Sequence, residues 1–421
     1  TEEQQTVIDN IVKSIDQGYA THLLFGVTGS GKTEIYIRLI EEAIKHGGTA
    51  LVLVPEISLT PQTAARLKGR FPNKQIAILH SALTRSQRHQ QWSLVSEGKA
   101  DIVLGARSAV FAPIPLDQLR IIIVDEEHDH SYKQDQVPRY HGRDVAIRRA
   151  WMTKCPIILG SATPSMESWW NATERKVSTL HVLTKRAPGL VAPTIEIVDM
   201  RYERTDGELG YTILSTRLER EIHRTLAMDG QILLLLNRRG FAPWIMCASR
   251  TCSWMLRCDH CDVSMVYHRR TPLIDVGFVR CHHCSIEQRI PKQCPDCSKS
   301  VIQLGAGTQR VEATLHNTLQ LPSDQIARLD ADTTSKASDL QTKLDRFGRG
   351  EIRVLLGTQM IAKGLDFPNV KLVGVIDADT AIDLPDFRAA ERTFQLVSQV
   401  CGRCGRSEGH ATAIKIGRAH V

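Results

Sequence analysis

Two short segments about ninety residues apart constrain this chain more than any other feature. Gly26–Thr33 (GVTGSGKT) follows the apolar run Leu23–Phe25, and Asp125–His128 (DEEH) follows the apolar run Ile121–Val124. The first segment has the glycine spacing of a phosphate-binding loop, in which backbone N–H groups close around phosphate oxygens at the start of a helix. The second places carboxylates at the end of a strand, where they can hold a metal ion and a water molecule. Together they predict a nucleoside triphosphatase.

Each residue type in these segments suits one task in phosphoryl transfer. Lys32 is expected to reach the β- and γ-phosphates, and Thr33 to offer its hydroxyl to Mg²⁺. Asp125 is expected to hold that metal, and Glu126 to orient and deprotonate the attacking water. The small residues of the loop complete the expected nucleotide site: Gly26, Thr28, Gly29, Ser30 and Gly31. A glycine-rich turn without a ligand is the competing interpretation, and the second motif argues against it.

Length and composition limit the class of protein. The chain has 421 residues, too many for one core, which predicts two or three domains. Hydrophobic residues make up 42% and charged residues 24%, as in soluble globular proteins, and no apolar stretch approaches the roughly 20 residues of a membrane span. The net charge of +7 is compatible with a polyanionic partner without establishing one. Because the sequence starts at Thr1, inside an expected helix, we expect the natural N-terminus to lie upstream.

Eight of the eleven cysteines are clustered between residues 247 and 297. They form four closely spaced pairs: Cys247 and Cys252, Cys258 and Cys261, Cys281 and Cys284, and Cys294 and Cys297. Two residues between ligands let one turn present both sulfurs to one metal, so the pairs predict two tetrahedral zinc sites with four thiolates each. The first pair departs from this spacing, with four intervening residues. Disulfides are the competing interpretation, and His260, His282 and His283 are alternative ligands.

Continuous apolar runs separated by polar, helical stretches recur in both halves of the chain. The runs are Leu51–Val54, Ile102–Leu104, Ile121–Val124, Ile157–Leu159, Ile232–Leu236, Val354–Leu356 and Leu372–Ile376. Runs without polar alternation are typical of strands covered on both faces, which predicts an α/β fold with two parallel-sheet lobes. The expected boundaries are lobe one at 1–185, a Pro-, Gly- and charge-rich linker at 186–214, lobe two at 215–245 and 301–415, and a zinc-binding insertion at 246–300. Residues 416–421 (IGRAHV) match the translation of a common sequencing adapter, and we interpret them as an artefact.

Two arginines stand near the end of the second set of runs. Gln399–Arg406 (QVCGRCGR) places Arg403 and Arg406 three residues apart, on one face of an expected helix. If the lobes close on ATP, both arginines can stabilise charge at the γ-phosphate from the opposite lobe. A basic helix face exposed to solvent is an equally good interpretation of the spacing alone.

The ordered set of motifs resembles superfamily 2 helicases, and within them the primosomal replication-restart DNA helicases. Besides the segments above, the resemblance rests on Pro55–Thr63 (PEISLTPQT), Gly105–Phe111 (GARSAVF), Gly160–Pro164 (GSATP), Asn237–Pro243 (NRRGFAP), Gly305–Gln309 (GAGTQ) and Gly357–Pro368 (GTQMIAKGLDFP). It covers almost the whole chain, and the four cysteine pairs between the fourth and fifth motifs make it specific to this family. The chain departs from the family at Leu365, where a histidine is usual. The family's N-terminal DNA-binding region and the domain after its last motif are absent, so we expect a motor core.

The resemblance implies two RecA-like lobes with a two-zinc insertion in the second, and an ATP- and Mg²⁺-dependent motor. This motor is expected to move 3′ to 5′ on single-stranded and forked DNA at stalled replication forks, and to restart replication by primosome assembly. The implied partners are primosome proteins, single-stranded DNA-binding protein and the machinery that loads the replicative helicase. A monomeric, cytoplasmic, nucleoid-associated bacterial protein is implied as well. Gln4 resembles the adenine-reading glutamine of the family, and Gly160–Thr163 resembles its link between hydrolysis and unwinding.

A segment after the acidic motif is similar to the aromatic-rich loop through which this family senses DNA. It contains Tyr132, Lys133, Arg139 and Tyr140. Rings can stack on unpaired bases while the cations meet phosphates. Either tyrosine can instead be packed inside the protein.

Two other functions stay open. One is a different superfamily 2 motor, such as a duplex-DNA translocase or an RNA helicase, which would be distinguished by the polymer that stimulates turnover. The other is a zinc-dependent scaffold that binds DNA and partners with little hydrolysis. The intact phosphate loop, acidic motif and arginines argue against the scaffold.

Overall fold

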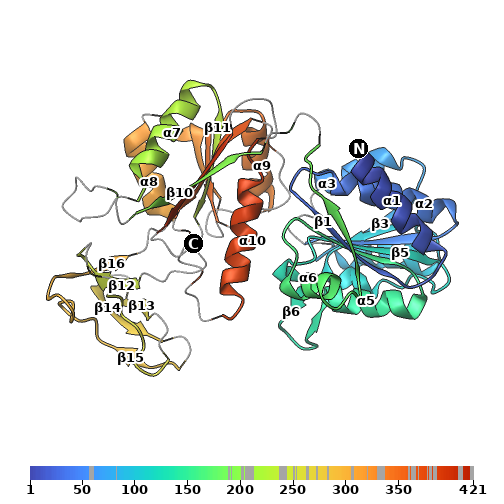
Figure 1. Cartoon of the computed structure of the whole chain (residues 1–421), viewed down its shortest axis with the longest axis horizontal. Coiled ribbons are helices and arrows are strands. Elements are labelled where there is room, and N and C mark those ends of the chain that lie inside the picture. Colours follow the sequence, from blue (N-terminus) through green and yellow to red (C-terminus); the bar gives the residue numbers. More distant parts are fainter. Residues whose placement is uncertain are drawn as a thin grey trace. The chain divides into compact units, whose positions relative to one another are not determined.

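The apolar runs of the sequence become strands of two separate parallel sheets (Figure 1). The contacts within the chain divide it into two units, Thr1–Leu190 and Val191–Val421. This computed structural model describes residues 1–55, 61–81, 83–187, 190, 192–200, 203, 213–236, 244–249, 252, 254–261, 265–271, 274–281, 284–304, 308–319, 321–329, 337–358, 361, 367, 369–376, 378, 382, 386–405 and 411–417. The two parallel-sheet units confirm the predicted fold class.

The first unit is built on a seven-stranded sheet with the strand order β3-β4-β2-β5-β8-β1-β9. Its strands are β1 (Thr21–Gly26), β2 (Thr49–Leu53), β3 (Ile76–Leu79), β4 (Ile102–Gly105), β5 (Leu119–Asp125), β8 (Ile157–Ser161) and β9 (Thr179–Leu183). The parallel register pairs Asp125 with Gly160 and Phe25 with Ser161. The carboxyl ends of β1, β5 and β8 therefore meet at one edge of the sheet, where α/β folds hold their ligands.

Helices cover both faces of this sheet, which explains why its strands carry no polar alternation. The helices are α1 (Glu2–Ile15), α2 (Lys32–Lys45), α3 (Pro61–Arg70), α4 (Arg85–Ser96), α5 (Gly142–Thr153) and α6 (Met166–Thr173). In β1, Leu24 packs in a cluster with residues of α1 and α2, and its neighbour Leu23 packs in another with residues of α4, α5 and α6. Figure 1 shows α1 and α2 on one side of the sheet and α5 and α6 on the other.

Short elements connect the strands near the ligand edge. They are the 3₁₀ segments η2 (Arg107–Phe111) and η3 (His130–Tyr132), and the strands β6 (Lys133–Gln134) and β7 (Tyr140–His141). β6 and β7 pair antiparallel, so residues 133–141 form a hairpin between η3 and α5. This hairpin leads directly from the acidic motif into α5.

The second unit contains a six-stranded sheet with the order β10-β20-β19-β11-β18-β17, in which every pairing is parallel. Its strands are β10 (Thr194–Asp199), β11 (Gln231–Leu236), β17 (Ile326–Leu329), β18 (Val354–Gly357), β19 (Val370–Ile376) and β20 (Thr412–Gly417). Its helical elements are α7 (Thr216–Ala227), α8 (Thr308–Leu319), η4 (Ser323–Gln325), α9 (Ala337–Gly348) and α10 (Ala389–Cys401). Leu233 packs with residues of α9 and α10, and Leu234 with residues of α7 and α8. Among the described residues, no helix has the length and apolar character needed to cross a membrane.

Two observations concern segments near the expected domain boundaries, and those boundaries stay predictions. Part of the expected linker is a strand, because β10 pairs with β20 along its whole length. The isoleucines of β10 are exposed, with Ile195 at 60% and Ile197 at 57%, so no buried apolar run marked this edge strand. Ile416, which we interpreted as part of an artefact, is only 1% exposed in the core of the second unit. Residues 418–421 lie outside the described part of the chain.

The cysteine-rich segment lies between β11 and β17, in agreement with an insertion into the second lobe. It contains β12 (Trp244–Cys247), β13 (Val266–Thr271), β14 (Ile274–Arg280), β15 (Glu287–Gln288) and β16 (Val301–Leu304). β12 pairs with β16, and β13, β14 and β15 form a second small sheet. Among the described residues of this segment, the hydrophobic cluster is small and includes Cys258 and Cys281. So small a core usually needs metals or other cross-links for stability.

Candidate nucleotide and metal sites

The phosphate loop lies between β1 and α2. Gly29 and Gly31 both have φ = +83°, a left-handed conformation that glycine adopts without steric cost. Gly31 is the N-cap of α2, so the first N–H groups of the helix face the loop. Lys32 Nζ donates to the carbonyl oxygen of Gly26 at 2.7 Å, which keeps its charge at the loop. The loop therefore has the backbone shape and the cation that bind phosphate oxygens.

Two other segments hold this loop from outside. Gln4 Nε2 on α1 donates to the carbonyl oxygen of Ser30 at 2.8 Å. A Cβ atom on Gly31 would lie 2.2 Å from this nitrogen, so the close approach requires glycine. Beyond β9, the backbone N–H of Ala187 donates to the carbonyl oxygen of Gly29 at 2.8 Å. The structure thus places Gln4 against the loop, and its role in reading adenine stays a prediction.

The acidic motif begins at the last residue of β5. Tyr36 Oη donates to Asp125 Oδ1 at 3.0 Å, and Glu126 has φ = +46°, which is rare for a residue with a side chain. Burial, followed by the charge of Glu126, raises the pKa of Asp125 to about 6, while Lys32 opposes that shift. A bound cation would stabilise the ionised carboxylate. Asp125, with the exposed hydroxyl of Thr33 on α2, therefore has the oxygen donors that suit Mg²⁺.

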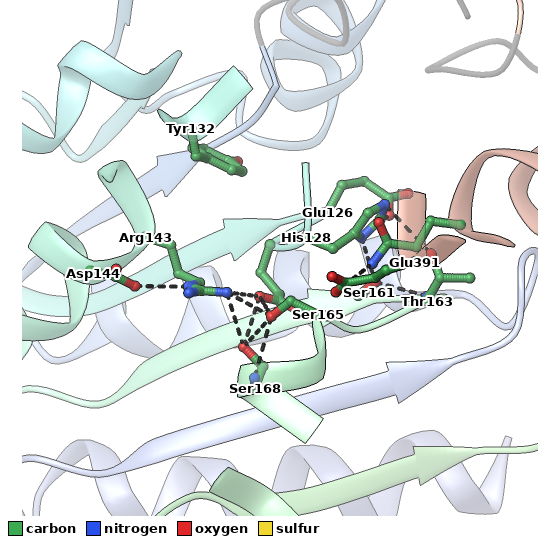
Figure 2. Close-up of polar contacts among 12 residues, drawn as sticks. Glu126, His128, Tyr132, Arg143, Asp144, Ser161, Thr163, Ser165, Ser168 and Glu391 are labelled. Carbon is green, nitrogen blue, oxygen red and sulfur yellow. Dashed lines mark hydrogen bonds and ion pairs between the residues drawn. The ribbon is translucent and has the colours of Figure 1, made fainter. Parts of the chain in front are cut away.

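His128 connects the acidic motif to Gly160–Thr163. Its Nδ1 lies 2.7 Å from Ser161 Oγ and 3.7 Å from a carboxylate oxygen of Glu126, and its Nε2 lies 3.5 Å from Thr163 Oγ1. Ser161 Oγ also accepts from the backbone N–H of Thr163 at 2.8 Å. Figure 2 shows these side chains gathered together. The carboxylate expected to act on water is thus physically joined to the segment expected to link hydrolysis with movement.

Glu127 was not singled out in the sequence, yet it is completely buried. Its carboxylate accepts from Arg143 Nη1 at 3.0 Å, from the backbone N–H of Ser165 at 2.7 Å and from Ser168 Oγ at 2.8 Å. Arg143 Nε donates to Asp144 at 2.9 Å (Figure 2). Removing one partner of such a buried pair typically costs about 3–5 kcal/mol. The only sequence signal for this buried pair was a third acidic residue in the motif, because no spacing rule connects Glu127 to Arg143.

Three of the expected DNA contacts lie on the hairpin. The side chain of Lys133 is 62% exposed, and Arg139 is exposed as well. Tyr140 is half-buried, and its ring meets the edge of the exposed Phe111 ring with 5.1 Å between centroids. Cations and aromatic surface therefore occur together on this hairpin, as single-strand binding requires.

Tyr132 has a different environment from the rest of the predicted loop. Its side chain is completely buried, and its hydroxyl donates to the carbonyl oxygen of Asp125 at 2.7 Å. The ring therefore offers no face to a base, and the packing interpretation holds for this tyrosine. The reason is that η3 turns the chain back under the end of β5, where an apolar ring fits the core.

The eight clustered cysteines form two groups, in which all four sulfur atoms lie within 4.8 Å of one another. One group contains Cys247, Cys252, Cys294 and Cys297, and the other contains Cys258, Cys261, Cys281 and Cys284. The outer two pairs of the sequence thus share one group, and the inner two pairs share the other. The longer gap between Cys247 and Cys252 does not keep either residue out of its group. His260 belongs to neither group, and His282 and His283 lie outside the described residues.

The sulfur separations distinguish a metal site from disulfides. The distances are 3.3 Å between Cys247 and Cys297, 3.6 Å between Cys252 and Cys294, and 3.5 Å between Cys258 and Cys284. Four Zn–S bonds of about 2.3 Å in a tetrahedron place sulfurs roughly 3.8 Å apart, whereas a disulfide requires about 2.05 Å. All eight cysteines are unbridged. The geometry fits four thiolates around one metal better than it fits disulfides.

The structure corrects the expected placement of Arg403 on a helix. α10 ends at Cys401 and Gly402 is its C-cap, so Arg403 lies in the following turn and not on a helix face. Gly405 has φ = +78°, which also prevents the helix from continuing. Arg406 lies outside the described residues, as do the motif segments 237–243 and 362–366, which includes Leu365. The roles of both arginines stay predictions.

The fold and the site together define a class of protein. A phosphate loop and paired carboxylates meet at the edge of one parallel sheet, and a second parallel-sheet unit follows in the chain. Two such units are the architecture of an ATP-dependent helicase motor.

Comparisons with known families and proteins agree with this class. Residues 1–169 match the DEAD/DEAH box helicase family, and residues 296–408 match the helicase conserved C-terminal domain. The replication restart protein PriA of Bacillus subtilis is 46% identical over 414 residues, which cover 97% of this chain and 50% of that protein. PriA of Haemophilus influenzae is 44% identical over 392 residues, which cover 93% and 51%. The chain is similar to PriA proteins over nearly its whole length, and it spans about half the length of these curated relatives.

Solved structures show the same fold at low sequence identity. RecG bound to a three-way DNA junction has a TM-score of 0.56 at 16% identity, with 99% of this chain and 42% of that chain covered. The DUF1998 helicase MrfA bound to DNA has a TM-score of 0.59 at 13% identity, with 98% and 48% covered. These likenesses support the two-unit helicase fold alone.

Proposed function

We propose that this chain is the motor of a DNA helicase that uses ATP to move 3′ to 5′ along DNA and acts at stalled replication forks to restart replication. The observation that carries the proposal is the chain of contacts from Glu126 through His128 to Ser161 and Thr163, beside the phosphate loop. These contacts connect the Glu126 carboxylate, which is proposed to act on the attacking water, directly to a segment outside the nucleotide site. The relatives named replication restart protein supply the biological process.

The residues of the first unit divide the work of hydrolysis in this proposal. Lys32 exchanges the carbonyl oxygen of Gly26 for the β- and γ-phosphates of ATP, and Glu126 orients a water molecule and takes its proton. A bound Mg²⁺, held by Thr33 and Asp125, would neutralise charge on the phosphates. Arg403 and Arg406 would add positive charge to the γ-phosphate as it leaves. Their position after α10, at the end of the helicase C-terminal match, supports that assignment.

The proposal includes one Zn²⁺ in each four-cysteine group. The metals would supply the stability that the small core of the insertion lacks, because thiolate coordination contributes directly to folding. We assign the insertion to unwinding and to contacts with other primosome proteins, not to hydrolysis. Its position between β11 and β17, away from the phosphate loop in the sequence, supports this division.

The proposed polymer is single-stranded and forked DNA, contacted at least by Lys133, Arg139 and Tyr140 on the hairpin. The proposed partners are primosome proteins, single-stranded DNA-binding protein and the machinery that loads the replicative helicase. A cytoplasmic, nucleoid-associated location follows from that process. The bacterial relatives, which are replication restart proteins, support the process from which these assignments follow.

Turnover of ATP in the presence of different polymers tests the proposal. Phosphate release is measured with single-stranded DNA, forked DNA, duplex DNA and RNA in turn, and Lys32→Ala serves as the inactive control. Stimulation by single-stranded or forked DNA, with displacement of a strand only from a 3′-tailed substrate, is the expected result. Preference for RNA or for tail-free duplex would favour the other superfamily 2 motors, and no Lys32-dependent turnover would favour the scaffold.

A further inference from the structure

The hairpin after the acidic motif is attached at both ends to that motif. Before the hairpin, the buried hydroxyl of Tyr132 donates to the carbonyl oxygen of Asp125 at 2.7 Å. After the hairpin, α5 follows β7 without a gap, and Arg143 is the second residue of α5. Arg143 Nη1 donates to the buried carboxylate of Glu127 at 3.0 Å. The two ends of one exposed hairpin are thus hydrogen-bonded to Asp125 and Glu127, the residues on either side of Glu126.

The Arg143 end also reaches the segment that follows Gly160–Pro164. Arg143 Nη1 donates to Ser165 Oγ at 2.6 Å, and Ser165 is the N-cap of α6. Ser165 Oγ lies 3.1 Å from the Glu127 carboxylate, and Ser168 Oγ donates to the same carboxylate at 2.8 Å. Figure 2 shows Arg143 with Asp144 on one side and the two serines on the other. One guanidinium therefore contacts α6 and the acidic motif at the same time.

The hairpin itself is held as one piece. Arg107 Nη1, on η2, donates to the carbonyl oxygen of Ser131 at 3.1 Å and to that of Lys133. The Arg107 guanidinium also lies over the Tyr140 ring, 5.8 Å from its centroid. These contacts tie the first strand of the hairpin to the second. A DNA strand bound to Lys133 and Arg139 would therefore move the base of the hairpin and not only its tip.

We propose that Arg143 is a positioning residue. It transmits the effect of DNA binding at the hairpin to Glu126 and to the Gly160–Thr163 segment. The inference rests on the proposed function, in which the hairpin contacts DNA. Glu127 stands between Glu126 and His128, so Arg143 cannot shift without moving the backbone that carries both. The guanidinium contacts Asp144 through Nε and Glu127 through Nη1, two nitrogens held at a fixed separation, and the single nitrogen of a lysine does not reproduce this geometry.

The substitution Arg143→Lys tests the proposal, because it keeps the positive charge beside Glu127 and removes the two-nitrogen geometry. We expect the ratio of DNA-stimulated to basal turnover to fall by about 2- to 30-fold, the range of coupling energies carried by such networks. The affinity for a labelled single strand should change much less than this ratio. Glu127→Gln, which keeps the shape of the acceptor, should act in the same direction and covers the case in which Arg143→Lys does not fold.

A matched control separates transmission from stability. Arg148→Lys is the control, because Arg148 lies on the same helix and its guanidinium contacts the Trp151 ring, 4.0 Å from the ring centroid, and not η2 or the acidic motif. It should leave the stimulation ratio unchanged, and thermal melting of both variants shows whether a change in the ratio accompanies a loss of stability. Equal losses of basal and stimulated turnover in Arg143→Lys, or an unchanged ratio, would show a merely structural role and overturn the proposal.

A second measurement works in the reverse direction. Coupling between two sites is reciprocal, so a non-hydrolysable ATP analogue with Mg²⁺ should change the amide hydrogen exchange of residues 133–141 in the wild type but not in Arg143→Lys. If no polymer stimulates the wild type, the proposed function fails, and the exchange result alone decides the role of Arg143. No nucleotide-dependent change at the wild-type hairpin would overturn the inference even if turnover is stimulated.

Discussion

Lys32 holds its charge at the phosphate loop through the carbonyl oxygen of Gly26, 2.7 Å away. Its ammonium group should stabilise the negative charge that develops on the transferred phosphoryl group, so we expect Lys32→Ala to lower ATP turnover by about 100-fold or more. Lys45→Ala is the matched control, because Lys45 lies at the exposed end of the same helix and pairs with Glu42 at 2.6 Å. Phosphate release measures both. Turnover near the wild-type rate in Lys32→Ala would remove the phosphate-loop assignment.

Single residues show how far the sequence predicted the site. The loop and the acidic motif were predictable because their chemistry requires fixed residue types at fixed spacing. The burial of Tyr132 was not, since an aromatic residue next to cations suits both a core and a binding surface. The Glu127–Arg143 pair was not predictable either, because long-range partners follow from topology and not from local spacing.

At the scale of elements, a buried polar chain joins three elements of the first unit. On β1, His22 Nδ1 lies 3.0 Å from Nε2 of His181 on β9, and its Nε2 lies 3.0 Å from Ser14 Oγ on α1. Burial, together with the nearby His181, lowers the pKa of His22 to about 4. The same helix carries Gln4, so these three hydrogen-bonded side chains help to fix α1 beside the phosphate loop.

This histidine pair should make the first unit sensitive to acid. The pKa of His22 falls from an ordinary 6.5 to about 4 on folding, so the unfolded chain binds the proton more readily. The stabilisation is therefore complete above about pH 6.5 and is lost progressively as the pH falls towards 4. We expect the unfolding temperature to drop over this interval less steeply in His22→Gln than in the wild type. Parallel curves for the two proteins, measured by thermal melting, would contradict the assignment.

The two cysteine groups should lose metal separately. Cys258→Ser removes a ligand from the inner group only, so we expect the zinc content to fall from two to one per chain and unwinding to suffer more than ATP turnover. Cys155→Ser is the control, because Cys155 is buried in the first unit outside both groups. Metal analysis of the purified proteins measures the stoichiometry. Unchanged zinc in Cys258→Ser would argue against metal in the inner group.

Elements were predicted well where hydrophobicity decides and poorly where an edge or a glycine decides. Every expected apolar run lies in or overlaps a strand, because burial on both faces leaves a continuous signal. β10 gave no such signal, since an edge strand keeps part of its surface in solvent. The end of α10 at Cys401 depends on Gly402 and Gly405, whose effect competes with the apolar spacing before them.

At the scale of the whole molecule, the first unit should be able to fold alone. Both faces of its sheet are covered by its own helices, and the described residues in its hydrophobic clusters all lie at or before Leu183. We expect residues 1–190, expressed separately, to melt cooperatively and to bind an ATP analogue. Turnover stimulated by DNA should be lost, because Arg403 and Arg406 are then missing. Calorimetry and phosphate release test the two halves of this prediction, and stimulated turnover equal to that of the full chain would contradict the proposed role of the arginines.

The strand order of the second sheet determines when this sheet can be completed during synthesis. Among the described strands of this unit β10 comes first and β20 last, yet the two are neighbours in the sheet, and β20 also joins β10 to β19. A growing chain can complete the first unit early, since proteins usually fold from the N-terminal domain onward. The second sheet, in contrast, has a gap in its interior until Gly417 has been made, and we expect the nascent second unit to stay protease-sensitive until then. Digestion of nascent chains arrested at successive lengths would reveal this order as a late, abrupt gain of resistance.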